Sequence, residues 1–90
     1  MTDMEGRYVS KYMTFQRRAP RLRAAKTGIW DVTNNQSGDL LAKICWFGPW
    51  RKYCALFEEG AVFDDSCLRE IAGFLMTLNH AHRSRKDVGR

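Results

Sequence analysis

Histidine and cysteine are the residues whose types could support catalysis or metal binding in this chain, which contains two histidines and three cysteines. Catalysis requires a nucleophile beside a base, a pair of carboxylates in a cleft, or a metal ion. His80 and His82 precede a basic segment, where histidines typically interact with the last carbonyls of a helix. The residue inventory therefore predicts a protein that is not an enzyme and has no catalytic residue.

Metal and nucleotide sites have characteristic spacings, which this sequence lacks. A zinc site could combine Cys67 with His80 and His82, but neither Cys-x-x-Cys nor His-x-x-x-His occurs. Cys67 would also lie roughly 20 Å along a helix from His80. The phosphate-binding patterns G-x-x-x-x-G-K and G-x-G-x-x-G are absent as well. We therefore expect neither a metal nor a cofactor.

Aromatic side chains are the remaining candidates for a functional role, and they are dense between residues 30 and 57. Packing against a helix is expected to use about three of them. The others, beside Arg51 and Lys52, could stack on unpaired bases or anchor a protein partner. Nearby carboxylates favour a protein partner because they repel phosphate. The candidate partner-binding residues are Trp46, Trp50, Arg51, Lys52, Tyr53, Glu58 and Glu59.

The formal net charge of +5 is unevenly distributed along the chain. Residues 1–26 carry seven cations and two carboxylates, residues 27–79 carry four and seven, and residues 80–90 carry four and one. Cations placed against phosphates supply much of the affinity for nucleic acid, although short basic ends also serve solubility alone. The candidate nucleic-acid-binding residues are Arg17, Arg18, Arg21, Arg23, Lys26, Arg83, Arg85 and Lys86.

Targeting signals and cysteine usage indicate the compartment. The chain has no run of about 18 apolar residues, and its first residues, with Asp3 and Glu5, lack the layout of a signal peptide. Cys45, Cys54 and Cys67 are odd in number and lie in apolar segments, which is typical of free, buried thiols in a reducing compartment. We expect a cytoplasmic protein without membrane contact.

Three consecutive segments alternate between apolar and polar residues, as half-buried strands do. Residues 29–34 are followed by the turn-forming run Asn-Gln-Ser-Gly, residues 40–47 are apolar on nearly both sides and end at Gly-Pro, and residues 50–57 end at Glu-Glu-Gly. The short connections favour an antiparallel meander with residues 40–47 as its central strand.

Residues 64–78 carry the strongest pattern in the chain. Leu68, Ile71 and Leu75 recur at the three- and four-residue spacing of an amphipathic helix. Asp64 and Asp65 stand where a helix N-terminus presents unpaired amide hydrogens, and these carboxylates are expected to cap the helix. The apolar stripe of this helix is expected to cover one face of the sheet.

We therefore predict an α+β fold in which a three-stranded antiparallel meander packs against one C-terminal helix. Residues 28–80 form the expected βββα domain. Residues 1–27 are expected to be a basic N-terminal arm, either disordered or partly helical, with an optional short helix in residues 4–16. Residues 81–90 are the expected basic C-terminal tail. An uncovered face or edge of this sheet could also support a homodimer.

Two short motifs carry a resemblance to known proteins. They are Trp50-Arg51-x-Tyr53 and Cys67-Leu68-x-Glu70-Ile71-Ala72, and Trp30-x-Val32-x-Asn34 and Ile44-Cys45-Trp46 extend the pattern. With them, residues 28–78 resemble a group of small, mostly uncharacterised proteins encoded by phages and prophages. The resemblance implies a bacterial host cell and no particular activity. The layout of three strands and a helix is also similar to that of the AP2-type and integrase arm-binding DNA readers, whose sheets are more basic.

Two functions from different classes remain open. The first is a non-enzymatic, phage- or prophage-derived protein that inhibits or modulates a host protein or nucleoprotein machine, such as an anti-CRISPR-like inhibitor of a defence system. The alternative is a DNA- or RNA-binding accessory protein that uses the sheet face and the basic tails. Deleting residues 1–26 and 83–90 is expected to separate them, because a phosphate-driven binder would lose most of its affinity.

Overall fold

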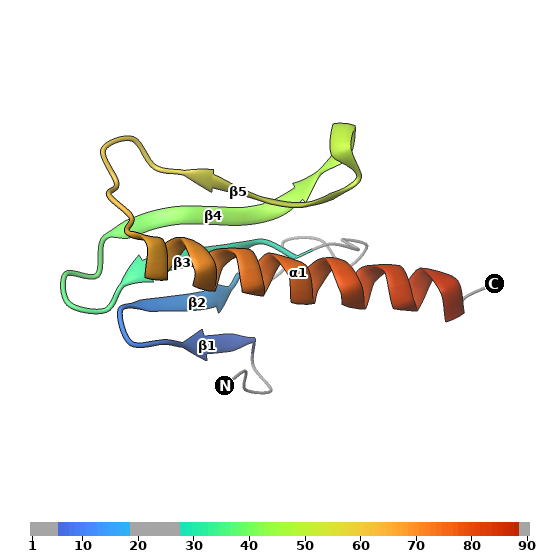
Figure 1. The fold of residues 1–90 in the computed structure, drawn as a ribbon, viewed down its shortest axis with the longest axis horizontal. Helices are drawn as coiled ribbons and strands as arrows, with labels where there is room; N and C mark the ends of the chain where they lie inside the picture. Colours follow the sequence, from blue (N-terminus) through green and yellow to red (C-terminus); the bar gives the residue numbers. More distant parts are fainter. Residues whose placement is uncertain (1–5, 19–27, 89–90) are drawn as a thin grey trace.

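The protein is an α+β fold in which one long helix covers one face of a five-stranded antiparallel sheet (Figure 1). The structure, a computed structural model, describes residues 6–18 and 28–88. Its elements are β1 (Arg7–Val9), β2 (Met13–Arg17), β3 (Trp30–Asn34), β4 (Leu40–Phe47), the 3-10 turn η1 (Gly48–Trp50), β5 (Lys52–Phe57) and α1 (Asp65–Val88). The order of the strands in the sheet is the order in the chain.

The predicted α+β class and C-terminal helix are confirmed, but the predicted number of strands is wrong. Residues 7–17 form β1 and β2 instead of a short helix, so the sheet begins well before residue 28. Met13 and Phe15 are buried while Thr14 between them is only half-buried, which is the period of a strand. Five residues are too few for this alternation to stand out in the sequence, and β2 is fixed by its pairing with the distant β3.

The predicted meander of the three following strands is present. Trp30 pairs with Ile44 across β3 and β4, and Ile44 pairs with Ala55 across β4 and β5. The strand at residues 40–47 therefore lies between its two expected neighbours. The two additional strands make β3, and not β4, the centre of the sheet.

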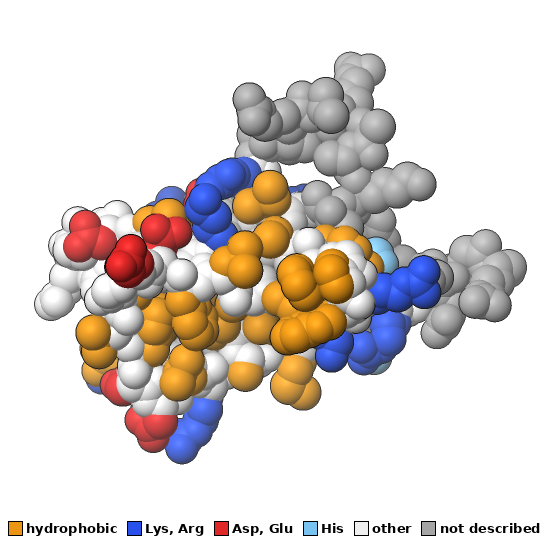
Figure 2. All heavy atoms as spheres, turned by 90° about the horizontal axis from the view of Figure 1, so that it is seen from above, with side chains coloured by type: hydrophobic (Ala, Val, Ile, Leu, Met, Phe, Trp, Pro, Cys, Tyr) orange, Lys and Arg blue, Asp and Glu red, His pale blue; other side chains and the backbone are white. Residues whose placement is uncertain are grey.

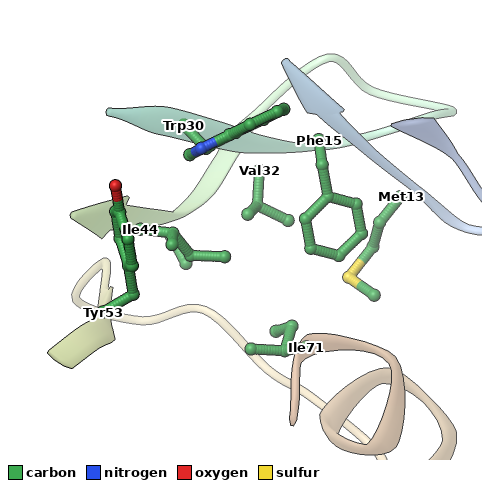
Figure 3. Packing of buried hydrophobic residues seen from close by; sticks show 8 residues of the cluster. Met13, Phe15, Trp30, Val32, Ile44, Tyr53 and Ile71 are labelled. Atoms are coloured by element: carbon green, nitrogen blue, oxygen red, sulfur yellow. The ribbon is translucent and has the colours of Figure 1, made fainter. Parts of the chain in front are cut away.

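The hydrophobic core lies between the sheet and α1 (Figure 3). Its buried members come from four strands and the helix, and they are Met13, Phe15, Trp30, Val32, Ala42, Ile44, Tyr53 and Ile71. From the helix, the ring of Phe74 stacks on Phe15 at 4.5 Å between centroids and meets Trp30 edge-on at 4.9 Å. Strand β2 thus supplies core residues that no other segment replaces.

Helix α1 begins as predicted and ends later than predicted. Asp64 caps it, since the Cys67 main-chain N–H donates to Asp64 Oδ1 at 2.8 Å, and this hydrogen bond lowers the pKa of Asp64. The helix continues to Val88, through most of the expected tail. Neither Gly nor Pro occurs between residues 74 and 88, and cations near a helix C-terminus are favoured by the helix dipole.

Candidate functional site

The hairpin tip between β4 and β5 exposes three of the predicted partner-binding residues, Trp50, Arg51 and Lys52. Trp50 is 68% exposed, and its ring meets Phe47 edge-on at 5.1 Å. Arg51 adopts a left-handed conformation with a φ of 54°, which glycine would adopt at lower cost.

Trp46 and Tyr53, also predicted to bind a partner, belong instead to the packing between sheet and helix. Tyr53 is 9% exposed. The half-buried Trp46 contacts Tyr53 edge-on at 5.5 Å and the His82 ring at 4.4 Å between centroids. His82 therefore packs on an aromatic ring, whereas the sequence led us to expect it at the helix carbonyls.

Glu58 and Glu59 lie at the far end of β5 from the hairpin tip. The Glu58 N–H donates to the Leu41 carbonyl at 3.0 Å, which closes the β4–β5 ladder at that end. The seven predicted partner-binding residues consequently do not form one patch. Three lie at the tip, two lie in the packing under the helix, and two lie at the opposite end.

An apolar groove of about 520 Å³, called here the β5–α1 groove, opens between the edge strand β5 and the helix. Its lining includes Trp50, Tyr53, Phe57, Leu68, Leu75 and Met76. Phe57 is 53% exposed and Met76 is 70% exposed. Figure 2 looks onto this side of the molecule and shows hydrophobic side chains spread across it. Exposed apolar surface of this kind is typical of interaction sites.

Along this groove, only some of the main-chain N–H and C=O groups of β5 form hydrogen bonds with the residues that the structure describes. Because Glu58 donates to Leu41 and the pattern alternates along an antiparallel ladder, the N–H and C=O groups of Tyr53, Ala55 and Phe57 point away from β4. Asn79 of α1 caps Tyr53: its Oδ1 accepts from the Tyr53 N–H at 2.7 Å, and its Nδ2 donates to the Tyr53 carbonyl at 3.4 Å. Ala55 and Phe57 have no such partner among the residues that the structure describes.

One end of the sheet is rich in cations. Lys52 and Arg83 border one hollow together with His80, and Arg17 borders another together with His82. Arg18 forms a double hydrogen bond with Asp31, both N–O distances being 3.0 Å, which raises the pKa of Arg18. We call this region, with Arg51 at the adjoining hairpin tip, the basic end. Carboxylates gather toward the opposite end in Figure 2.

The predicted nucleic-acid-binding residues lie only in part within the described structure. Arg17, Arg18 and Arg83 are at the basic end, where Arg83 borders the same hollow as Lys52 of the hairpin tip. Arg21, Arg23 and Lys26 fall outside the described residues, as do the side chains of Arg85 and Lys86. Strands β2 and β5 and helix α1 therefore bring together cations that are far apart in the sequence.

A second hollow lies on the other side of α1, next to the edge strand β1. It is lined by Tyr8, Trp30, Glu70 and Phe74, among others, and has a volume of about 490 Å³. One carboxylate oxygen of Glu70 is buried without a hydrogen-bond partner among the described residues.

Among residues 6–18 and 28–88, no group of three or more His, Cys, Asp or Glu side chains could hold a metal ion. Within the same ranges, the structure contains no helix with the length and apolar character needed to cross a bilayer.

The groove contains residues that the sequence interpretation did not assign to a site. Leu68 and Leu75 were read as core residues because they follow the helical apolar stripe, and Met76 lies beside that stripe. The polar Asn79, which directly follows the apolar Leu78, was the one feature of the sequence that could have indicated a contact between the helix and the sheet edge.

No protein-family model, no curated protein and no solved structure matches this chain.

Proposed function

We propose that this chain is a non-enzymatic binding protein of phage or prophage origin that inhibits or modulates a host protein or nucleoprotein machine. The β5–α1 groove is the surface through which it binds a protein segment of the host. The observation that carries this proposal is the unpaired main chain of Ala55 and Phe57 beside an exposed apolar groove. An anti-defence, anti-CRISPR-like role is the specific form that the resemblance to phage proteins suggests.

The chemistry of the groove suits an extended segment that adds a strand to β5. Main-chain groups of such a segment would pair with Ala55 and Phe57, and its apolar side chains would contact Phe57, Leu68 and Met76. At the hairpin end the groove borders Lys52, Arg83 and His80. A segment with apolar residues followed by acidic ones therefore complements this surface.

The Ala55→Pro variant tests strand addition without touching the rest of the sheet. The Ala55 N–H points away from β4, so proline removes a donor that the β4–β5 ladder does not use. Its φ of about −65° lies within the range of extended backbone. Ala55→Ser, which retains the N–H and a small side chain, is the matched control.

The experiment is a pull-down from host lysate with wild type, Ala55→Pro and Ala55→Ser as baits, with and without nuclease, read by mass spectrometry. A stoichiometric protein that survives nuclease, stays with Ala55→Ser and is lost with Ala55→Pro is the expected result. Recovery of the same protein by Ala55→Pro would contradict strand addition. Capture of nuclease-sensitive material alone would contradict the protein-binding function.

A DNA- or RNA-binding accessory function is the second candidate, because the fold collects Arg17, Lys52 and Arg83 at one end. The sequence suggested that deleting residues 1–26 would discriminate between the two functions, but the fold rules this test out. That deletion removes β1 and β2 together with the core residues Met13 and Phe15, so it would unfold the protein. Charge substitutions at the basic end are the appropriate test instead.

A further inference from the structure

Cys45 and Cys54 lie directly opposite each other on neighbouring strands. They are Cα partners in the antiparallel pairing of β4 with β5, and both are free and half-buried. Trp46 and Tyr53, the next pair along the ladder, face the helix. Because successive residues of a strand point to opposite faces, the two thiols share the sheet face that α1 does not cover.

The main chain holds this pair at a separation that a disulfide can span. The Glu58 to Leu41 hydrogen bond fixes the alternation of the ladder and makes Cys45 and Cys54 a hydrogen-bonded pair, with Cα atoms about 5.5 Å apart. Disulfides join Cα atoms roughly 4.4 to 6.8 Å apart. The Cβ atoms of such a pair, about 5.5 Å apart, must approach by roughly 1 to 2 Å. The resulting strain makes the bond easy to reduce again.

The surroundings of the two thiols favour an anionic reagent. Lys43 lies two residues away from Cys45 on the same face of β4. Glutathione disulfide carries net negative charge and is attracted by this cation. Cys67 lies instead on α1, where burial raises the pKa of its thiol, which lowers its reactivity at neutral pH.

The geometry points to a dithiol at Cys45 and Cys54 that small disulfides of the glutathione class oxidise to a reversible internal disulfide. One cysteine thiolate attacks a sulfur of glutathione disulfide, forming a mixed disulfide and releasing one glutathione thiolate. The second thiolate then attacks the protein sulfur of the mixed disulfide and releases the second glutathione. The two protein thiols lose two protons and two electrons, and glutathione disulfide is reduced to two glutathione molecules.

This bond would cross-link the hairpin that presents Trp50 and Arg51 and borders the β5–α1 groove. The inference does not depend on what the groove binds, because it rests on the register of β4 and β5 alone.

The test uses intact-mass spectrometry after the folded protein is treated with glutathione disulfide and quenched in acid. The Cys67→Ser variant retains the pair, and Cys67→Ser combined with Cys45→Ser or with Cys54→Ser breaks it. Cys67→Ser is expected to lose the mass of two hydrogens and to carry no glutathione, whereas each single-thiol variant gains one glutathione. Reduced glutathione in excess should restore the original mass of Cys67→Ser.

The same reaction in urea distinguishes the folded geometry from mere proximity in the sequence. We expect the internal disulfide of Cys67→Ser to close at least about tenfold faster in the folded protein than in the unfolded chain, because the sheet positions the two thiols. Circular dichroism of each variant confirms that it is folded. Stable glutathione adducts on Cys67→Ser, or a rate no faster than in urea, would overturn the inference.

Discussion

Asn79 belongs to the helix, but it completes the sheet. Its side-chain amide accepts from the N–H of Tyr53 and donates to its carbonyl, so it occupies the position that a sixth strand would take at that residue. This contact limits the open edge of β5 to Ala55 and Phe57. A single side chain thereby decides where a partner strand could pair.

Replacing Asn79 by alanine should destabilise the protein by about 1–2 kcal/mol, because two main-chain groups of the buried Tyr53 lose their hydrogen bonds. Urea unfolding monitored by tryptophan fluorescence measures this change. Thr77→Ala is the control: its hydroxyl bonds only to the carbonyl of Gly73 in the same helix, and its effect should stay within about 0.5 kcal/mol. Equal effects of the two variants would contradict the assigned role of Asn79.

Because Asp64 caps α1 through its carboxylate, the stability of the protein depends on pH. Hydrogen bonding from the Cys67 N–H holds the pKa of Asp64 below its ordinary value. A carboxyl group whose pKa is lower in the folded state stabilises the fold above its unfolded pKa of about 4, and this stabilisation is lost as the pH falls through the lower, folded value.

The Asp64→Asn variant isolates this contribution, since asparagine is an equally good cap and does not titrate. As the pH is lowered from neutral through the ordinary range of a carboxyl pKa, its melting temperature should fall less than that of the wild type. Asp64→Ala should melt below both at neutral pH. Parallel melting curves of wild type and Asp64→Asn across this range would argue against the cap.

At the scale of elements, strand β2 could not be predicted from the sequence. Its core residues Met13 and Phe15 lie in a short basic segment, where Arg17 and Arg18 follow immediately. Pairing with β3 across an intervening connection makes it a strand, and that non-local pairing has no local signature. The meander from β3 to β5 could be predicted because short turns join strands of clear alternation.

The Phe15→Ala variant tests whether β2 is an integral part of the domain. Phe15 is fully buried and stacks on Phe74, so its truncation should cost about 3–5 kcal/mol, a large share of the stability of a small domain. Chemical denaturation measures the loss, and Val9→Ala, at the exposed position on β1, should cost far less. Near-wild-type stability of Phe15→Ala would mean that residues 7–17 are a dispensable arm.

At the scale of the whole molecule, the antiparallel topology separates charge along the long axis. Strand ends and the helix C-terminus place Arg17, Lys52 and Arg83 at one end, whereas Glu58 and the capping Asp64 lie at the other. The sequence had indicated basic tails and an acidic core. In the fold, that pattern becomes a basic end and an acidic end. A nucleic acid would therefore be expected to bind at the basic end, which gives a way to test protein against nucleic acid as the partner.

If nucleic acid binds, it should bind at the basic end and depend on salt. Fluorescence anisotropy with a labelled single-stranded oligonucleotide should show an affinity that falls with salt by about 0.7 logarithmic units per phosphate contacted and per tenfold change in concentration. The Arg51→Glu/Lys52→Glu variant should bind more weakly with a shallower slope, while Glu58→Gln/Glu59→Gln should bind no less tightly than the wild type. Equal weakening by both pairs would contradict binding at the basic end.

The sequence by itself determined the local features of this protein. The alternation of residues 40–47, the apolar stripe of the helix and the cap at Asp64 each depend on neighbours within a few residues, so they could be recognised without the fold. The turn at Gly48-Pro49 could likewise be recognised, although the predicted strand at residues 50–57 begins only at Lys52 because the turn continues to Trp50.

Only the tertiary structure decided which of these residues meet. Trp46 and Tyr53 turned out to pack under the helix, Asn79 to cap the edge of β5, and Cys45 to face Cys54, because these relations depend on strand register and on where α1 lies across the sheet. The β5–α1 groove has the same origin. The helix leaves the edge of β5 partly uncovered, and no local pattern in the chain encodes that gap.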